Sequence, residues 1–189
     1  MMITRAGLTY YRFISLPVAI GLLLPSLFIP WVTINFLGSS LFSPLYIIRV
    51  FFLQGAGDGD QNLFDLYDLM TSYNDTFSAS VASIGSLVAS VAIMPSGIML
   101  RAHRPRLVLV AGCLAVASCV FWLYSIESLK SNFSHQAAIT GGIVGEEFRG
   151  HERALADIII GVGLGPYLAL AAGIGGIMYR IIGTASAKR

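Results

Sequence analysis

The chain has 189 residues, of which 56% are hydrophobic and 12% are charged, and its formal net charge is +2. A soluble domain carries about 25% charged residues, so this composition excludes an ordinary soluble protein and favours an integral membrane protein. The small net charge hides a strong asymmetry, because acidic and basic residues occupy different parts of the chain.

Four long apolar runs predict four membrane-spanning helices. They cover about residues 13–34, 77–100, 107–126 and 158–179, and none has a charged side chain in its middle. Each has about 20 residues or more, enough to cross a ~30 Å hydrocarbon core at about 1.5 Å per residue. We therefore expect an all-α membrane protein, a single-domain bundle of four transmembrane helices, with outer loops at about residues 35–76 and 127–157.

The charge asymmetry orients these spans. All 10 carboxylates fall in the two predicted outer loops. Basic residues gather in the N-terminal segment, the link between spans 2 and 3 and the C-terminal tail: Arg5, Arg12, Arg101, Arg104, Arg106, Arg180, Lys188 and Arg189. Because Lys and Arg near span ends mark the cytoplasmic side, we expect a multi-pass protein of the cell membrane with both termini in the cytoplasm. The first span is too long for a signal-peptide core, and we expect it to be retained.

The first span ends in a Pro30-Trp31 pair. Trp prefers the membrane–water interface, so Trp31 is predicted to be an interface anchor on the outer side. Each outer loop then contains one glycosylation sequon, at Asn74 and at Asn132. These sequons agree with the predicted orientation.

The first outer loop is predicted to form an ordered cap. Its segment Leu41–Leu53 is apolar, but it has too few residues to span and carries Arg49, so a β-rich or interfacial segment fits it better. A short helix is expected from Asp60 to about Ser72, with an apolar stripe of Leu63, Tyr67 and Met70. In the second outer loop, residues 145–156 are expected to extend span 4 outward as a helix.

Small residues recur at helical spacing in the spans. Helix association in lipid depends on close packing, which small residues permit. Span 2 has the stripe Ala82, Gly85, Ala89 and Ala92, with serines at 78, 83, 86 and 90, and span 4 has Gly161, Gly165, Ala169 and Gly173. These eight positions are predicted helix-packing residues. Packing within the bundle is favoured over a lateral contact between protomers, and for Gly161 and Gly165 we expect the internal face.

Few side chains suggest chemistry. Oxygen-bearing residues from Asp58 to Asn62 resemble part of a calcium loop, and Glu147 with His151 has metal-ligand spacing. A turn with a helix cap accounts for the first, and two ligands are too few for the second. Cys113 and Cys119 fall on different faces of span 3 and are interpreted as small core residues. We expect no enzyme, no cofactor and no metal site, and we expect the basic link 101–106 to meet lipid headgroups rather than nucleic acid.

The layout resembles the claudin and peripheral-myelin group of tetraspan proteins. The residues Pro30-Trp31-Val32-Thr33-Ile34-Asn35-Phe36-Leu37-Gly38-Ser39 look like a shortened form of the element at the end of the first claudin span, and Ala111-Gly112 early in span 3 is also similar. The Gly-Leu-Trp element and the two cysteines of the claudin first loop are absent. The resemblance implies a non-enzymatic tetraspan with a packed outer cap that associates laterally, without the family's disulfide or pore.

The sequence therefore favours a structural membrane protein that self-associates or scaffolds a membrane assembly. Its expected partners are the lipid bilayer and either further copies of itself or other membrane subunits. An accessory subunit of a larger respiratory or transport complex is the first alternative. A channel or transporter is the second, disfavoured because the span interiors offer hydroxyl groups rather than acidic or basic side chains.

Overall fold

The computed structural model describes residues 5–35, 39–44, 74–99, 104–140, 156–157 and 160–187. In this part of the chain the long helices are α1 (Arg5–Ser26), α4 (Asn74–Met99), α5 (Arg104–Thr140) and α7 (Gly165–Ala187). The strands are β1 (Val32–Asn35), β2 (Ser39–Phe42) and β3 (Ile160–Val162). The chain is thus mainly helical, with one small sheet.

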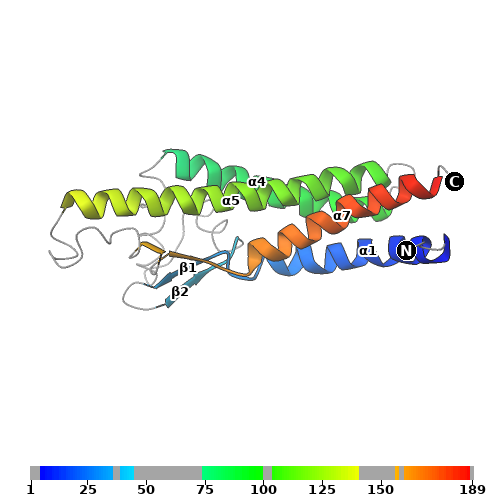
Figure 1. Cartoon of the computed structure of the whole chain (residues 1–189), viewed down its shortest axis with the longest axis horizontal. Helices are drawn as coiled ribbons and strands as arrows, with labels where there is room; N and C mark the ends of the chain where they lie inside the picture. Colours follow the sequence, from blue (N-terminus) through cyan, green and yellow to red (C-terminus); the bar gives the residue numbers. More distant parts are fainter. Residues whose placement is uncertain are drawn as a thin grey trace.

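The helices form an elongated bundle of antiparallel neighbours (Figure 1). α5 packs against α4 on one side and α7 on the other, α1 packs along α7, and a smaller contact joins α1 to α4. The start of α1 and the end of α7 lie at the same end of the bundle, which we call the termini end, and the sheet lies toward the opposite end, the sheet end. α5 reaches beyond the other helices at the sheet end (Figure 1).

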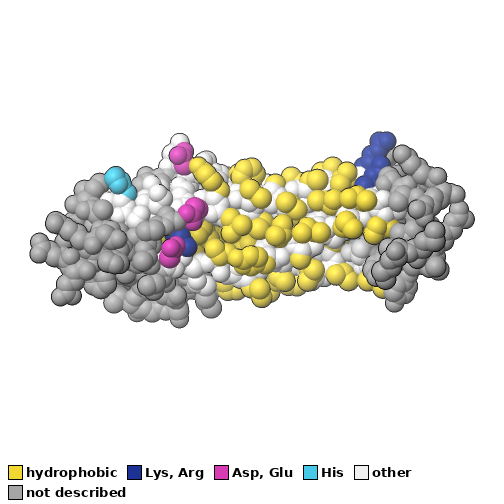
Figure 2. Space-filling model, in the orientation of Figure 1, with side chains coloured by type: hydrophobic (Ala, Val, Ile, Leu, Met, Phe, Trp, Pro, Cys, Tyr) yellow, Lys and Arg dark blue, Asp and Glu magenta, His cyan; other side chains and the backbone are white. Residues whose placement is uncertain are grey.

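Three of these helices, α4, α5 and α7, are long and apolar enough to cross a membrane. In α1, the apolar stretch among the described side chains is the shorter Ile14–Ser26. Figure 2 shows a broad band of apolar side chains around this face of the bundle. Carboxylates lie at its sheet-end edge, where Lys130 pairs with Asp157, and basic side chains without carboxylates beside them lie at the termini end. A multi-pass membrane location follows from these helices.

The ends of the predicted spans need correction at two places. The first span was expected to run to Ile34, but α1 ends at Ser26 and turns follow, with the N–H of Phe28 donating to the carbonyl of Pro25 at 2.9 Å. Pro30 disfavours helix at the residue before it, and the β-branched residues after Trp31 favour the extended strand β1. The fourth span was expected from residue 158, but α7 begins at Gly165, with Pro166 in its first turn.

The other two spans differ from prediction in length rather than in kind. α4 matches the predicted run 77–100 closely. α5 includes the predicted run 107–126 and continues to Thr140, into the expected second outer loop. Residues 145–155, which were expected to extend span 4 outward as a helix, lie outside the described residues, and strand β3 interrupts any helix before α7.

The sheet joins the end of the predicted first span and the start of the first outer loop to the start of the predicted fourth span. Its order is β2-β1-β3, with both pairings antiparallel; Val32 pairs with Phe42 of β2 and with Val162 of β3. Within the segment Leu41–Leu53, for which a β-rich or interfacial structure was expected, Leu41 and Phe42 lie in strand β2, whereas β1 lies mostly in the predicted first span. Residues 45–53 and the expected helix 60–72 lie outside the described residues.

The α4–α5 contact follows a regular seam. Buried residues alternate at spacings of four and three on α4, at positions 76, 80, 83, 87, 90 and 94, and of three and four on α5, at positions 108, 111, 115, 118, 122, 125 and 129. This is the spacing of helices that pack side by side at a shallow crossing angle. Most of these side chains are small, so the two backbones come close together.

Candidate functional site

Trp31 connects the sheet to the helix bundle. Its side chain is only 1% exposed, and its indole Nε1–H donates to the carbonyl of Ser26 at 2.7 Å. Its own carbonyl accepts from Trp122 Nε1 at 3.1 Å and from the backbone N–H of Gly163 at 3.0 Å. Trp31 was predicted to be an interface anchor on the outer side; its indole packs inside the protein, and its depth in a membrane stays a prediction.

Hydroxyl groups line the α4–α5 seam. The Oγ atoms of Ser80 and Ser125 are 2.6 Å apart, and Thr76 Oγ1 donates to Ser128 Oγ at 3.0 Å. Nearer the middle of the helices, Ser83 Oγ donates to the carbonyl of Ser118 at 2.8 Å. Further along, Ser90 Oγ donates to the carbonyl of Ala111 at 2.8 Å. Ser80, Ser83, Ser90, Ser118 and Ser125 are at most 1% exposed.

This hydroxyl seam joins two helices rather than lining an open path. Each hydroxyl named above finds a partner within the protein, as a polar group in an apolar medium requires. The serines of α4 at positions 80, 83 and 90 belong to this seam. Their burial and their hydrogen bonds to α5 agree with packing.

On α7, the small residues at positions 165, 169 and 173 all lie inside the bundle. A Cβ added to Gly165 would overlap the Trp31 ring, and one added to Gly173 would lie 2.8 Å from the carbonyl oxygen of Gly112 on α5. Glycine is thus required for the α5–α7 crossing. Gly161 was predicted on the same helix face, but it lies in β3, where an added Cβ would collide with Thr33 Oγ1.

The small-residue stripe of α4 lies differently. Gly85 and Ala92 are exposed and Ala82 and Ala89 are half-buried, and no heavy atom lies within 4 Å of the position that a Cβ on Gly85 would take. The favoured interpretation, packing within the bundle, therefore does not describe Gly85. We call these four residues the outward small-residue face of α4. A lateral contact between protomers was the alternative for this stripe, and it stays a prediction.

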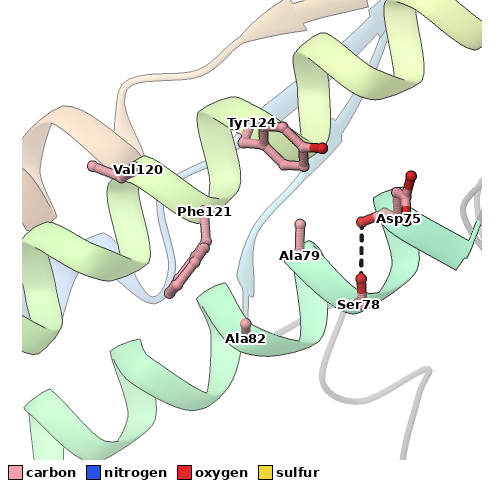
Figure 3. Close-up of a pocket in the computed structure, with 7 residues that line it drawn as sticks. All are labelled: Asp75, Ser78, Ala79, Ala82, Val120, Phe121 and Tyr124. Atoms are coloured by element: carbon pink, nitrogen blue, oxygen red, sulfur yellow. Dashed lines mark hydrogen bonds between the residues drawn. The ribbon is translucent and has the colours of Figure 1, made fainter.

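A groove of about 560 Å³ lies beside this face, between the sheet-end halves of α4 and α5. It is lined by Asp75, Ser78, Ala79, Ala82, Val120, Phe121 and Tyr124. In Figure 3, Phe121 points from α5 toward α4, whose short side chains Ala79 and Ala82 leave the space between the helices open. Asp75 lies in the first turn of α4, at one end of the groove. The groove is therefore apolar along its length and carries a carboxylate at one end.

Other predicted positions fall at the sheet end. Asn74, a candidate glycosylation site, is the exposed first residue of α4, whereas Asn132 lies half-buried within α5. Lys130 of α5 binds Asp157 with an Nζ–Oδ1 distance of 2.8 Å. This ion pair joins α5 to the segment before β3. Cys119 is buried and Cys113 is exposed, so the two cysteines do lie on different faces of α5.

No cluster of metal-ligating side chains occurs within the ranges that the structure describes. The calcium-like residues 58–62 and the pair Glu147 and His151 lie outside those ranges. The outward face and the groove of α4 are thus the surfaces on which the described residues suggest an interaction.

Sequence reasoning did not identify the seam or the groove. The seam had a signal, because Thr76, Ser80, Ser83, Leu87, Ser90 and Met94 alternate at four and three. The groove had none, since it depends on which residues of α5 lie opposite Ala79 and Ala82.

Comparison with known proteins does not assign the chain to a family. No protein-family model matches the sequence. No curated protein matches it either, and no solved structure is similar to the fold.

Proposed function

We propose that this chain is a non-enzymatic integral membrane protein with four spans, which associates with copies of itself and so builds a scaffold in the plane of the membrane. The observation that carries this proposal is the outward small-residue face of α4. Its residues Ala82, Gly85, Ala89 and Ala92 are exposed or half-buried in the single chain. Small residues such as these let the backbones of two helices approach closely, and helix association in lipid depends on such packing.

The composition of the other exposed positions supports this interpretation. Most other exposed positions of the apolar band carry large side chains, for example Val110 and Ile174, which are 49% and 51% exposed. The small exposed residues Gly21 and Ala171 stand singly, whereas those of α4 form a stripe. Gly in a helix interior is about 1 kcal/mol less favourable than Ala. If position 85 contacted only lipid tails, glycine would lower helix stability with no compensating contact. If a second helix packs on this face, glycine lets the two backbones come closer together.

The orientation belongs to the same proposal. Both helices nearest the chain termini reach the termini end, where basic side chains lie away from the described carboxylates (Figure 2). The described Lys130 lies at the other end, paired with Asp157. By the positive-inside rule the termini end is cytoplasmic, and the sheet then lies outside the cell. α1 is the fourth span of this arrangement, because it runs along α7 inside the bundle.

The resemblance to the claudin and peripheral-myelin group supports lateral association as well. That group combines four spans with a packed outer cap, and here β1, β2 and β3 form a small sheet on the bundle. The pore role of claudins is not part of the proposal, because the first-loop cysteines are absent from this sequence.

The experiment compares two glycine variants of the full chain purified in mild detergent. Gly85→Leu fills the outward face, and Gly21→Leu is its matched control, because Gly21 also has no heavy atom within 4 Å of an added Cβ. Mass-resolved gel filtration should show an oligomer for the native chain and for Gly21→Leu, and a folded monomer for Gly85→Leu.

Other results would contradict the proposal. The proposal is wrong if the native chain is monomeric at every concentration. It is also wrong if the native chain forms an oligomer that Gly85→Leu leaves intact. Co-purification of a foreign subunit in fixed proportion, lost in Gly85→Leu, would instead support the accessory-subunit alternative. Ion flux in liposomes would support the channel alternative.

A further inference from the structure

The groove between α4 and α5 ends in a carboxylate that its walls do not neutralise. Its lining residues include one charged side chain, Asp75, and the rest are apolar or carry hydroxyl groups. The one hydrogen bond drawn within the groove runs from Ser78 Oγ to the backbone carbonyl of Asp75, at 3.1 Å, so it does not use the carboxylate (Figure 3). At the sheet end, the described Lys130 pairs with Asp157 rather than with Asp75.

The walls of the groove suit an alkyl chain. Val120 and Phe121 line the groove from α5 and are 58% and 41% exposed. Ala79 and Ala82 form the floor opposite them. A volume of about 560 Å³ falls within the range of sites for small molecules, roughly 300–1,000 Å³. The groove therefore offers space for the upper part of an acyl chain.

The position of the groove along the bundle sets the depth of its occupant. Asp75 is at the N-terminus of α4, and carboxylates mark the sheet-end edge of the apolar band (Figure 2). The carboxylate thus lies at headgroup level and the alanines lie at the level of the first chain carbons. Tyr124 lines the groove between these levels, and its hydroxyl can donate a hydrogen bond to a phosphate oxygen.

We propose that this groove binds a phospholipid whose headgroup carries a primary ammonium, such as phosphatidylethanolamine, in the leaflet at the sheet end. The ammonium binds the Asp75 carboxylate, the phosphate accepts from Tyr124, and one acyl chain lies against Ala79 and Ala82. A primary ammonium has N–H groups that donate hydrogen bonds to a carboxylate, whereas the quaternary ammonium of phosphatidylcholine has no N–H group. An anionic headgroup without an amine would be repelled by Asp75.

The charge argues against a second copy of the chain as the occupant of the groove. In a symmetric contact across this part of α4, each Asp75 would approach the other, and like charges repel. The outward face at Gly85, Ala89 and Ala92 lies nearer the termini end than the groove-lining residues of α4. Ala82 belongs to both surfaces, so the two sites are separated by variants at other positions: Asp75 lines only the groove, and Gly85 lies only on the outward face.

The test uses native mass spectrometry of the full chain from mixed micelles that contain phosphatidylethanolamine, phosphatidylcholine or phosphatidylglycerol. The native chain should retain one lipid per protomer, and it should prefer phosphatidylethanolamine to phosphatidylcholine by about two- to fivefold, which is the range that an exposed charge pair supports. Phosphatidylglycerol should be retained least.

The variants separate the headgroup contact from the chain contact. Asp75→Asn should abolish the preference between headgroups while a lipid is still retained, and Asp75→Glu should keep the preference. Ser78→Phe adds bulk at an exposed position in the groove and should lower retention of every lipid. Val88→Phe is the control, because Val88 is 47% exposed on α4 and does not line the groove.

Three outcomes would overturn this inference. They are an unchanged headgroup preference in Asp75→Asn, equal retention of lipid by Ser78→Phe and the native chain, and tighter retention of phosphatidylglycerol than of phosphatidylethanolamine. If Ser78→Phe dissociated an oligomer and left lipid retention unchanged, the occupant would be a second copy. The same spectra report the oligomeric state, so failure of the lipid site and failure of self-association give different results.

Discussion

The indole rings of Trp31 and Trp122 meet edge to face, with their centroids 5.5 Å apart and their planes at 80°. The N–H of Trp122 also donates to the carbonyl of Trp31 at 3.1 Å. One residue precedes β1 and the other lies in α5, so this pair fixes the sheet against the bundle. The same Trp31 ring covers Gly165, the first residue of α7.

Trp122→Phe should lower the free energy of unfolding measurably. The substitution keeps a ring but removes the N–H that binds the Trp31 carbonyl, and a net hydrogen bond contributes about 0.5–1.5 kcal/mol. Thermal and denaturant unfolding in mild detergent would measure the loss. A double-mutant cycle with Trp31→Phe should show coupling of about 0.5–1.5 kcal/mol, as for other aromatic pairs. Additive effects would mean that the pair contributes only through burial.

Ser83→Ala should weaken the α4–α5 contact. Interhelical hydrogen bonds in a membrane protein average about 0.6 kcal/mol and reach about 1.7 kcal/mol. Ser118→Ala should cost less, because the shorter bond of Ser83, at 2.8 Å, is to the Ser118 backbone carbonyl, and the Oγ–Oγ distance is 3.3 Å. Ser86→Ala, on the half-buried flank of the same helix, is the control. Equal stability of Ser83→Ala and Ser86→Ala would contradict the role of the seam.

Replacing glycine by alanine should have opposite effects at two positions. A Cβ at Gly173 would lie 2.8 Å from the Gly112 carbonyl oxygen, so Gly173→Ala must push α5 and α7 apart, and overpacking costs about 1–3 kcal/mol. At Gly85 there is open space, so Gly85→Ala should leave the monomer unchanged or stabilise it by up to about 1 kcal/mol through helix propensity. Melting curves of the monomeric fraction would compare them. Destabilisation at both positions would show that Gly85 is also packed within the monomer.

The orientation predicts which engineered cysteines react from outside the cell. In a background without Cys113 and Cys119, Ser131→Cys lies at an exposed position of α5 toward the sheet end and should react with an impermeant thiol reagent. Ala102→Cys, in the basic link between spans 2 and 3, should react only after the cells are opened. The reverse pattern would show that the termini are outside.

The apolar runs predicted where the long helices lie along the chain more accurately than they predicted the residues at which each helix begins and ends. α4 agrees with prediction because its run has no break before Pro95 near its end. The run ending at Ile34 was read too long because hydropathy does not distinguish a helix from a buried strand, and Val32, Thr33 and Ile34 are β-branched. α5 was read too short because its continuation to Thr140 is polar, and a helix that extends out of an apolar layer carries no hydropathy signal there.

The choice between the two faces of α4 also lay beyond the sequence. Both the hydroxyl seam and the outward face repeat at three and four residues, and both consist of small side chains. The hydroxyls are inside because each needs a hydrogen-bond partner, which α5 supplies. Trp31 was placed at the lipid interface because a single sequence does not show that Trp122 lies opposite it.

The length of α5 has a mechanical consequence. Its 37 residues extend for about 55 Å at 1.5 Å per residue, whereas a hydrocarbon core is about 30 Å thick. The ion pair between Lys130 and Asp157 ties the part near the sheet end to the segment before β3. A tilt of about 10° around its termini end would move the far end of such a rod by roughly 10 Å. Small changes of helix angle within the bilayer are therefore converted into large lateral displacements of the end of α5 near Thr140.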